Sequence, residues 1–330
     1  MARIKDIASM AGVSEATVSR VLNGTARVNR DTEEKVLRAI KKFNYRPNML
    51  ARGLRQKDGR LIGLFVPDIH HPTFSLIAGY VEKYSRQKGL NLMIGSTGFD
   101  PDIEAGMIND MLDRNANGII ALRVSNRSYA SRVIKNHDIP FILLDRAEQD
   151  SPLPYVMTDN IIAGRMAAEY LHAKGHHEII CVTGPRDVSV VDMRMRGFVK
   201  GLEERGGSLP AQNIFEGDFS FESGRLAAEK IIEEKHPATA IWAQNDPMAL
   251  GIMHQYIKSG FSVPRDISVM GMDNIDLASQ FIPGLTTISQ PFEEMCSRAV
   301  LHIAEPGNGR KKHVILKPGL IERDSVMNIL

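Results

Sequence analysis

The first residues of the chain carry apolar side chains at helical spacing, interrupted by turn signals. Residues 4–11 are predicted to form a short helix, which Gly12 ends. A second helix is predicted over about residues 15–22, with Ser14 as its N-cap and Asn23-Gly24 at its end. Two helices joined by a glycine-containing turn have the spacing of a helix-turn-helix.

A third helix and a short hinge follow. The third helix starts near Asp31, and its predicted apolar stripe consists of Val36, Leu37, Ile40 and Phe43. After the interruption at Tyr45–Asn48, a helical segment over residues 49–54 is predicted, then a polar linker. Since isolated helices shorter than ~12–15 residues are marginal in water, we do not expect this segment to be a stable helix by itself.

From residue 61 onward, short apolar runs alternate with amphipathic helices, which indicates βαβ units and parallel sheets. The alternation restarts near Asp159, so two similar lobes are expected in tandem. The predicted fold class is an all-α helix-turn-helix head with a hinge helix, then an α/β body of two doubly wound lobes. The predicted strands are Leu61–Pro67, Leu90–Ile94, Gly118–Val124, Pro140–Leu144, Glu178–Thr183, Thr239–Ala243 and Asp266–Met272, with further strand or crossover material at Leu316–Arg323.

Charge is distributed unevenly between head and body. Residues 1–60 hold 14 basic and 6 acidic side chains, a net charge of +8, which leaves 27 basic and 33 acidic side chains in the rest, a net charge of −6. A basic head on an acidic body is typical of a nucleic-acid-binding module attached to another function. A disordered basic tail is the alternative, but this head contains enough apolar residues to fold.

The second helix has one apolar side and one polar side. Val18, Val21 and Leu22 face inward at helical spacing, which leaves Glu15, Ala16, Ser19 and Arg20 outward. In a major groove, Arg20 can contact guanine, Glu15 can accept from cytosine, and Ala16 can touch a thymine methyl. Thr17, Ser19 and Asn23 are better placed for phosphates. An ordinary three-helix domain with exposed polar residues is the competing interpretation.

Other classes of protein find little support. Cys181 and Cys296 lie in apolar surroundings without a C-x-x-C motif, so we expect reduced core residues of a cytoplasmic protein. Neither a signal peptide nor a membrane-length apolar run is present. His172 and His176 have a zinc-like spacing but no third ligand, so no metal or other cofactor is expected. Because the sequence has no signature of a catalytic nucleophile or of a cofactor-binding loop, an enzyme is not expected. A transport binding protein is not favoured either, because the sequence has no export signal and adds a helix-turn-helix head.

The head resembles the lactose-repressor/galactose-repressor family of bacterial transcription regulators. The resemblance is carried by residues 4–8 and 13–24, by the hinge-like residues 45–54, and by residues 245–251 and 269–274 of the body. It covers nearly the whole chain. It implies a repressor that binds a palindromic operator as a homodimer, through Ser14, Glu15, Ala16, Thr17, Ser19, Arg20, Asn23, Tyr45, Asn48 and Leu54.

The resemblance also assigns a role to the hinge, which we expect to be disordered without DNA and to fold on the operator. Leu54 matches the family's leucine that enters the minor groove at the operator centre, where an apolar wedge unstacks a base step. Without the resemblance, packing of Leu54 onto the body would be the preferred interpretation.

The effector site is expected beyond the carboxyl ends of the strands, as in open α/β sheets. Arginines, aspartates and phenylalanines follow the predicted strands there, a combination that suits a sugar. By resemblance, Arg194 and Asp273 match effector-binding positions, Phe219 matches an aromatic wall, and Phe74 lies at the first-lobe wall. For Asp246, holding a strand end is favoured over ligand contact. The complete predicted effector set is His71, Phe74, Arg123, Val190, Arg194, Phe219, Asp246 and Asp273.

The sequence does not identify the effector. Val188 and Val190 occupy the loop where the purine-responsive branch presents polar residues, which disfavours a purine and favours a sugar or sugar derivative. An inducer, a corepressor and a protein corepressor stay possible. The expected domains are residues 1–47 (head), 48–60 (hinge and linker), 61–159 with about 291–318 (first lobe), and 160–290 with 319–330 (second lobe). The dimer face is expected on helices Phe74–Lys88 and Asp102–Arg114. We see no heptad repeat after the body that could join two dimers, so a tetramer is not expected.

Overall fold

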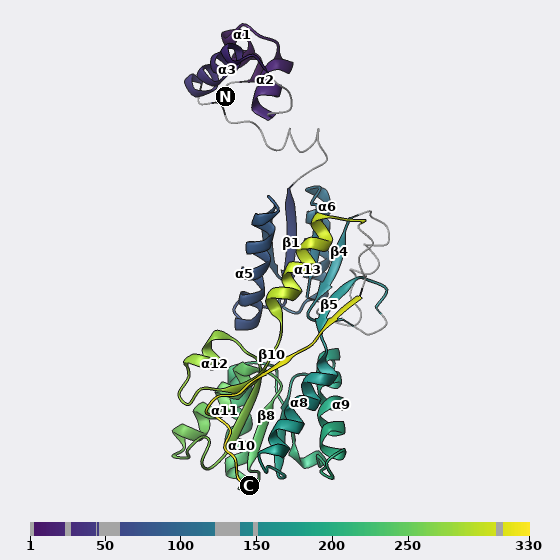
Figure 1. Cartoon of the computed structure of the whole chain (residues 1–330), viewed down its shortest axis with the longest axis vertical. Helices are drawn as coiled ribbons and strands as arrows, with labels where there is room; N and C mark the ends of the chain where they lie inside the picture. Colours follow the sequence, from purple (N-terminus) through teal and green to yellow (C-terminus); the bar gives the residue numbers. More distant parts are fainter. Residues whose placement is uncertain are drawn as a thin grey trace. The chain divides into compact units, whose positions relative to one another are not determined.

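The computed structural model describes residues 3–23, 28–43, 45, 60–122, 139–147, 151–307 and 313–330. The chain divides into two compact units, Met1–Asp58 and Gly59–Leu330, which we call the head and the body (Figure 1). The predicted hinge helix, with Asn48 and Leu54, lies outside the described residues.

The described residues of the head form three helices around a small apolar core. They are α1 (Ile4–Ala11), α2 (Glu15–Asn23) and α3 (Arg30–Lys42). Two residues of the predicted third-helix stripe do not face the core: Leu37 is 51% exposed and Phe43 is 41% exposed, whereas Ala39 is buried. The fully buried core residues are Ile7, Ala8, Ala11, Val18, Val36 and Ala39.

The turn between α1 and α2 has the geometry that its sequence predicts. Gly12 has a φ of 68°, a left-handed conformation that glycine adopts without strain, and its N–H donates to the carbonyls that end α1. The Ser14 hydroxyl accepts the N–H of Thr17 at 3.2 Å, which confirms Ser14 as the N-cap of α2. These two residues therefore end one helix and begin the next within three positions.

The first lobe of the body is a six-stranded parallel sheet in the order β11-β5-β4-β3-β1-β2. Helices α5 (Pro72–Gln87) and α13 (Phe292–Ala304) share a core with one face of the sheet, and α6 (Pro101–Asp113) shares a core with the other. The strands are β1 (Leu61–Val66), β2 (Asn91–Ser96), β3 (Gly118–Ala121), β4 (Phe141–Leu144), β5 (Tyr155–Thr158) and β11 (His313–Leu316).

The second lobe repeats this plan in the order β12-β10-β9-β8-β6-β7, in which only the edge strand β12 is antiparallel. Its strands are β6 (Ile179–Thr183), β7 (Ile214–Glu216), β8 (Ala240–Ala243), β9 (Ser268–Asp273), β10 (Thr286–Ser289) and β12 (Gly319–Ile321). Its helices are α8 (Asn160–Ala173) and α9 (Ser189–Glu203) on one face, α10 (Phe221–Glu233) and α11 (Asp246–Lys258) on the other, with the short α12 (Asp276–Gln280) and a 3-10 turn at Ala211–Asn213. None of the helices described for this chain is both long and apolar enough to cross a membrane.

The chain passes between the lobes three times: from β5 to α8, from β10 to α13, and from β11 to β12. Each of the seven strands predicted from apolar runs overlaps an observed strand. The prediction missed β5, β7 and β10, which have only three or four residues each. The last of these matters most, because the crossover into the first lobe starts at its end.

Helices α8 and α9 pack unusually closely. A Cβ on Gly164 of α8 would lie 1.9 Å from the carbonyl oxygen of Arg194, and a Cβ on Gly197 of α9 would lie 2.0 Å from that of Ile161. Only glycine permits this approach of two backbones. It brings Arg194 of α9 within reach of Asn160, the first residue of α8.

We expect Gly164→Ala to lower the free energy of unfolding by about 1–3 kcal/mol, because the added methyl group forces the two backbones apart. Urea denaturation of the full chain measures this change. Gly106→Ala, on the exposed side of α6 with no atom near the new methyl group, is the matched control and should stabilise by up to about 1 kcal/mol through helix propensity. Equal effects of the two substitutions would contradict the packing argument.

Candidate functional site

In the head, α2 presents a mixed polar surface. Glu15, Ala16 and Arg20 are exposed, whereas Val18 is fully buried against α1 and α3. Thr17 and Ser19 are half-buried beside them. Tyr45 packs against the head core, which places it at the edge of this unit. The side chain of Asn23 lies outside the described residues. The helix therefore offers a carboxylate, a methyl group and a guanidinium to a groove, as the sequence predicts for base contacts.

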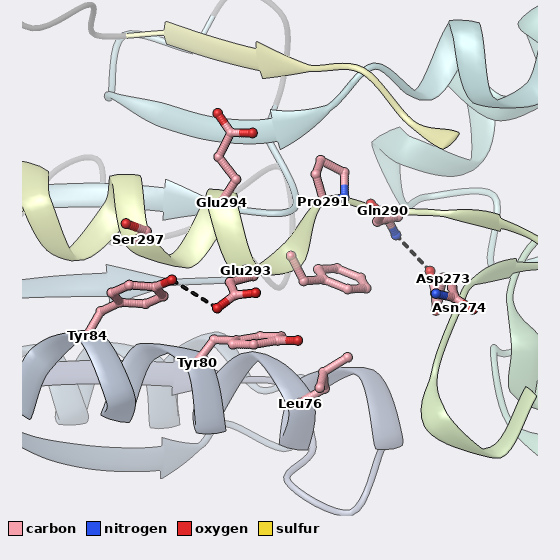
Figure 2. Close-up of a pocket in the computed structure, with 11 residues that line it drawn as sticks. Leu76, Tyr80, Tyr84, Asp273, Asn274, Gln290, Pro291, Glu293, Glu294 and Ser297 are labelled. Atoms are coloured by element: carbon pink, nitrogen blue, oxygen red, sulfur yellow. Dashed lines mark hydrogen bonds between the residues drawn. The ribbon is translucent and has the colours of Figure 1, made fainter. Parts of the chain in front are cut away.

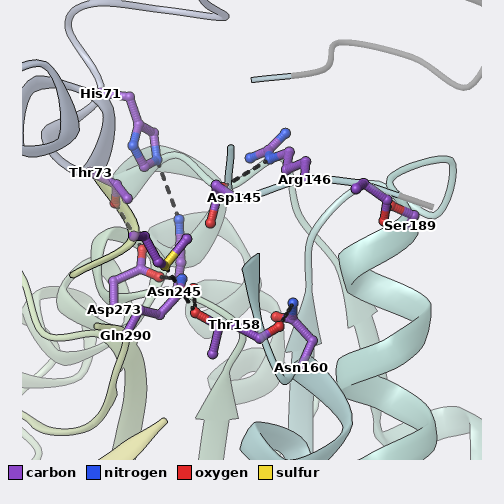
Figure 3. A network of polar contacts seen from close by, with 12 residues as sticks. His71, Thr73, Asp145, Arg146, Thr158, Asn160, Ser189, Asn245, Asp273 and Gln290 are labelled. Carbon is purple, nitrogen blue, oxygen red and sulfur yellow. Dashed lines mark hydrogen bonds and ion pairs between the residues drawn. The ribbon is translucent and has the colours of Figure 1, made fainter. Parts of the chain in front are cut away.

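In the body, polar and aromatic side chains of both lobes meet at the carboxyl ends of the two sheets (Figure 3). They enclose a small cavity of about 20 Å³, which has room for about one water molecule. The lining residues are His71, Thr73, Phe74, Asp145, Arg146, Arg194, Phe219, Asn245, Asp273 and Gln290.

Asp273 is bonded from both lobes. Its Oδ2 accepts the hydroxyl of Thr73, from the first turn of α5, at 2.8 Å, and its Oδ1 accepts Nε2 of Gln290 at 2.7 Å. Gln290 lies on the β10–α13 crossover and in turn accepts the hydroxyl of Thr158, at the end of β5, at 2.6 Å. All four side chains are buried. One continuous chain of hydrogen bonds thus joins the predicted effector carboxylate to two of the three crossovers.

Arg194 is held rigidly beside this chain. Its Nε donates to Oδ1 of Asn160 at 2.8 Å, and its NH1 donates to the carbonyl oxygen of Gln244 at 2.6 Å. Burial lowers the pKa of the guanidinium, whereas the carboxylates of Asp273 and Asp145 oppose that shift. The side chain remains a cation aimed by two hydrogen bonds into a largely desolvated site, where charge-assisted hydrogen bonds are strong.

His71 and Asn245 also line the cavity, and both contact the backbone of Phe219. Nε2 of His71 lies 3.2 Å from the carbonyl oxygen of Phe219, which also accepts Nδ2 of Asn245 at 2.8 Å. Burial lowers the pKa of His71, so the ring is neutral at pH 7 and its Nε2 donates to that carbonyl. This contact again joins the first lobe to the second.

Three of the residues that line the cavity have a strained backbone. Asp145, Phe219 and Asp273 have φ values of 69°, 71° and 125°, a region that disfavours side chains. The Phe219 ring occupies space over Gly184, where a Cβ would lie 2.1 Å from it. Such strain persists only where the surrounding structure enforces it, and it typically marks functional sites.

Several buried polar atoms at the cavity have no hydrogen-bond partner among the described residues. They are Nδ1 of His71, Oδ1 of Asp145 and Nε of Arg146. Buried polar atoms in native proteins are nearly always bonded, so this set indicates that the cleft is built for a polar ligand.

Two predicted residues lie outside the cavity lining. Asp246 sits behind it, where its carboxylate accepts the Thr287 hydroxyl at 2.6 Å and the N–H of Ile275 at 2.9 Å. Burial and the nearby Asp273 raise the pKa of Asp246 to about 7. It holds the turn that carries Asp273, the role favoured for it from the sequence. Val190 is buried in an apolar cluster with first-lobe residues, and Arg123 lies outside the described residues.

Five lining residues were absent from the predicted set. Asp145 and Arg146 directly follow β4, and Thr73 and Asn245 begin α5 and α11, so the rule of strand ends and helix starts points to them. Gln290 follows β10, which the apolar pattern did not reveal, and so its position had no signal. The lining residues absent from the predicted effector set are Thr73, Asp145, Arg146, Asn245 and Gln290. Three of them, Thr73, Arg146 and Asn245, do belong to the residues that follow the predicted apolar runs.

Comparison with known proteins shows the same two parts. Residues 3–48 match the model of the lacI family of bacterial regulatory proteins, and residues 168–326 match the periplasmic binding protein-like domain. The chain is 32% identical to the HTH-type transcriptional repressor PurR of Vibrio atlanticus (strain LGP32), over 100% of both chains.

Solved structures agree over the whole length. The lac repressor dimer bound to operator and the anti-inducer ONPF has a TM-score of 0.90 and 28% identity, covering 99% of each chain. The complex of the transcriptional regulator CelR with cellobiose has a TM-score of 0.72 and 25% identity, covering 98% of this chain and 100% of that one. The resemblance and the fold class predicted from the sequence are confirmed. The chain belongs to the lacI family of bacterial regulatory proteins, and it is a DNA-binding transcription regulator under the control of a small-molecule effector.

Proposed function

We propose that this regulator is a homodimeric repressor, acting in the cytoplasm, whose hold on a near-palindromic operator is set by a sugar or sugar derivative bound between the lobes of the body. The observation that carries the proposal is the cleft itself: Arg194 and Asp273 are buried in it with strained backbone and unbonded polar atoms around them. Such a site is expensive to build for stability alone, which supports a binding role.

The chemistry of the lining suits a polyhydroxylated ligand. Phe74 and Phe219 offer flat apolar faces, Oδ1 of Asp145 offers a free acceptor, and Arg194 offers charged donors. Sugars match this combination, since one ring face is apolar while the hydroxyls both donate and accept. The neighbour CelR was solved with cellobiose, which supports the same class. Val190, packed against the first lobe, adds no polar group.

Signal transmission follows from the bonding of Asp273. With about 20 Å³ free, the described conformation admits no sugar, so effector binding requires the lobes or the lining to move. A ligand that takes Asp273 competes with the Thr73 hydroxyl, and this loosens a direct bond between the lobes. The effector thereby changes the orientation of the lobes and, through it, the affinity for the operator. By linkage, operator binding must change the affinity for the effector by the same factor.

The effector proposal is tested by a thermal-shift panel of sugars, sugar acids, sugar phosphates and purines. A ligand at 100 times its dissociation constant stabilises the protein by about 2.7 kcal/mol. We expect a sugar or sugar derivative to shift the melting temperature of the wild type, and the shift to disappear in Arg194→Ala and Asp273→Ala. Arg196→Ala, an exposed neighbour on α9, is the matched control and should keep it. A hit that survives both cleft substitutions would place the ligand elsewhere.

The DNA proposal is tested by selecting a binding site from random DNA with the full chain. We expect a near-palindrome to be enriched, because a two-fold dimer presents two copies of α2. Arg20→Ala should then weaken binding to that site by about 10–100-fold and relax the preference at one base pair per half-site. Arg38→Ala, an exposed arginine on α3, should leave the base preference unchanged. A preference unaltered by Arg20→Ala would exclude its base contact.

The dimer proposal rests on one side of the body. There α5 exposes parts of Leu76, Tyr80 and Tyr84 beside the start of α13, around a cavity of about 530 Å³ (Figure 2). Asn274 lines the same cavity, and the chain beyond it exposes Leu277 and Ile282 around α12. The neighbour with 28% identity is a dimer bound to operator, which supports covering this surface with a second copy.

We expect Ile282→Asp to shift the protein from dimer towards monomer in sedimentation velocity, because a carboxylate would have to be buried between subunits. Ile282 is 88% exposed in the single chain, so its replacement should leave the circular dichroism spectrum and melting temperature of the monomer intact. Leu330→Asp, equally exposed at 87%, controls for surface charge and should remain dimeric. An unchanged dimer in Ile282→Asp would move the interface elsewhere, and a tetramer would contradict the proposed assembly.

A further inference from the structure

Arg323 bonds to the turn that carries Asp273. It lies just after β12, so it directly follows the crossover from β11 to β12. Its NH2 donates to Oδ1 of Asn274 at 2.6 Å, and its NH1 donates to the carbonyl oxygen of Leu285 at 2.6 Å. One half-buried guanidinium therefore links the third crossover of the body to the residue next to Asp273.

The guanidinium is not needed to hold its own segment in place. The N–H of Arg323 donates to Oγ1 of Thr286 at 2.9 Å, and the N–H of Asp324 donates to the carbonyl oxygen of Gly284 at 3.0 Å. The next residue, Ser325, is fully buried, and its hydroxyl is hydrogen-bonded as well. Because these bonds anchor the segment, the two bonds of the guanidinium are left to act on the residues that they contact.

The turn that receives one of these bonds has a strained backbone. Asp273 and Asn274 have φ values of 125° and 61°. Asp246 accepts the N–H of Ile275 at 2.9 Å and so holds the main chain of the turn, whereas Arg323 holds the side chain of Asn274. Strain of this kind persists only where the surrounding structure enforces it. The position of Asp273 should therefore depend on Arg323 as well as on Asp246.

The chemistry of the guanidinium suits this task. Both of its acceptors are uncharged, one an amide oxygen and the other a carbonyl oxygen. A hydrogen bond with one charged partner is roughly twice as strong as a bond between neutral groups. The planar fork of arginine also fixes the directions of both bonds at once, which the single ammonium group of lysine does not. Arg323 thus fixes the orientation of the Asn274 side chain.

We propose that Arg323 is a positioning residue of the effector site: through Asn274 it holds the Asp273 carboxylate where it meets Thr73 of the first lobe. With this link, all three crossovers between the lobes are connected to Asp273 or to its neighbour. A ligand that takes Asp273 then acts on every connection between the lobes. The proposal rests on the proposed function, in which Asp273 binds the effector.

The first test needs neither effector nor operator. Hydrogen–deuterium exchange is followed by mass spectrometry in the full-length wild type, in Arg323→Gln and in Asn274→Gly, in which glycine tolerates the positive φ. We expect both variants to exchange the amides of the first turn of α5 several-fold faster, because a displaced Asp273 bonds Thr73 less well. Thr73→Val removes that bond directly and gives the size of the full effect.

The site of the faster exchange separates positioning from a purely local role. Arg323 and Asn274 belong to the second lobe, whereas α5 belongs to the first, so a local loss of packing around Arg323 does not change exchange in α5. The double variant should be no faster than either single one, since both remove the same bond. Arg265→Gln, at an exposed arginine of the second lobe that bonds Ser262, is the matched control and should leave α5 unchanged. Faster exchange confined to the second lobe would overturn the proposal.

A second test uses the sugar or sugar derivative that the thermal-shift panel selects. At a temperature where circular dichroism shows both proteins folded, Arg323→Gln should bind it about tenfold more weakly than the wild type, the loss expected for one hydrogen bond to a charged group. Equal affinities, with the ligand still dependent on Asp273, would overturn the role of Arg323 and leave the proposed function intact. Faster exchange in α5 of Arg323→Gln, combined with no ligand in the panel for the wild type, would support the positioning of Asp273 and count against the proposed function alone.

Discussion

The carboxylate of Asp273 is the point on which the body depends. It accepts one hydrogen bond from α5 of the first lobe and one from the β10–α13 crossover, and Gln290 passes the connection on to Thr158 at the end of β5. Because all of these groups are buried, the loss of any one leaves another unsatisfied, and the arrangement behaves as a unit. A ligand that binds Asp273 therefore acts on the joint between the lobes directly, with no longer pathway required.

The surrounding structure exists largely to hold that carboxylate and its cationic neighbour in place. Asp246 fixes the turn after β9, in which Asp273 and Asn274 both have positive φ, and Asp246 is itself fitted against Gly271, where a Cβ would lie 2.3 Å from its Oδ1. On the other face, glycines in α8 and α9 bring Asn160 to Arg194. Two close contacts that only glycine permits thus position the two charged groups that we propose bind the effector, and the backbone is strained at Asp273 and Asn274.

Much of this was visible in the sequence, for identifiable reasons. Parallel strands buried on both faces are continuous apolar runs, so β1, β4, β6 and β9 were predicted. The end of β9 led to Asp273 through the strand-end rule and the resemblance, whereas Phe219, which follows the missed strand β7, was assigned by the resemblance. In contrast, β10 is a four-residue strand of threonine, isoleucine and serine, so it is not a continuous apolar run. Its threonine hydroxyls are buried and hydrogen-bonded to Asp246 and to the N–H of Arg323. Gln290 was missed with it. The contacts of Arg146 with the rings of Phe74 and Phe219 depend on how the two lobes meet, which no local sequence pattern encodes.

The three crossovers have a consequence for synthesis on the ribosome. The head is built from one contiguous stretch at the amino terminus, but the first lobe is completed only by α13 and β11, which follow almost the whole of the second lobe in the chain. Until those last segments emerge, β5 is an unpaired sheet edge and the apolar face that α13 covers is open, both of which favour association with other chains. A nascent or truncated chain can therefore carry a complete helix-turn-helix while its effector cleft does not yet exist, so that DNA recognition is available before control is.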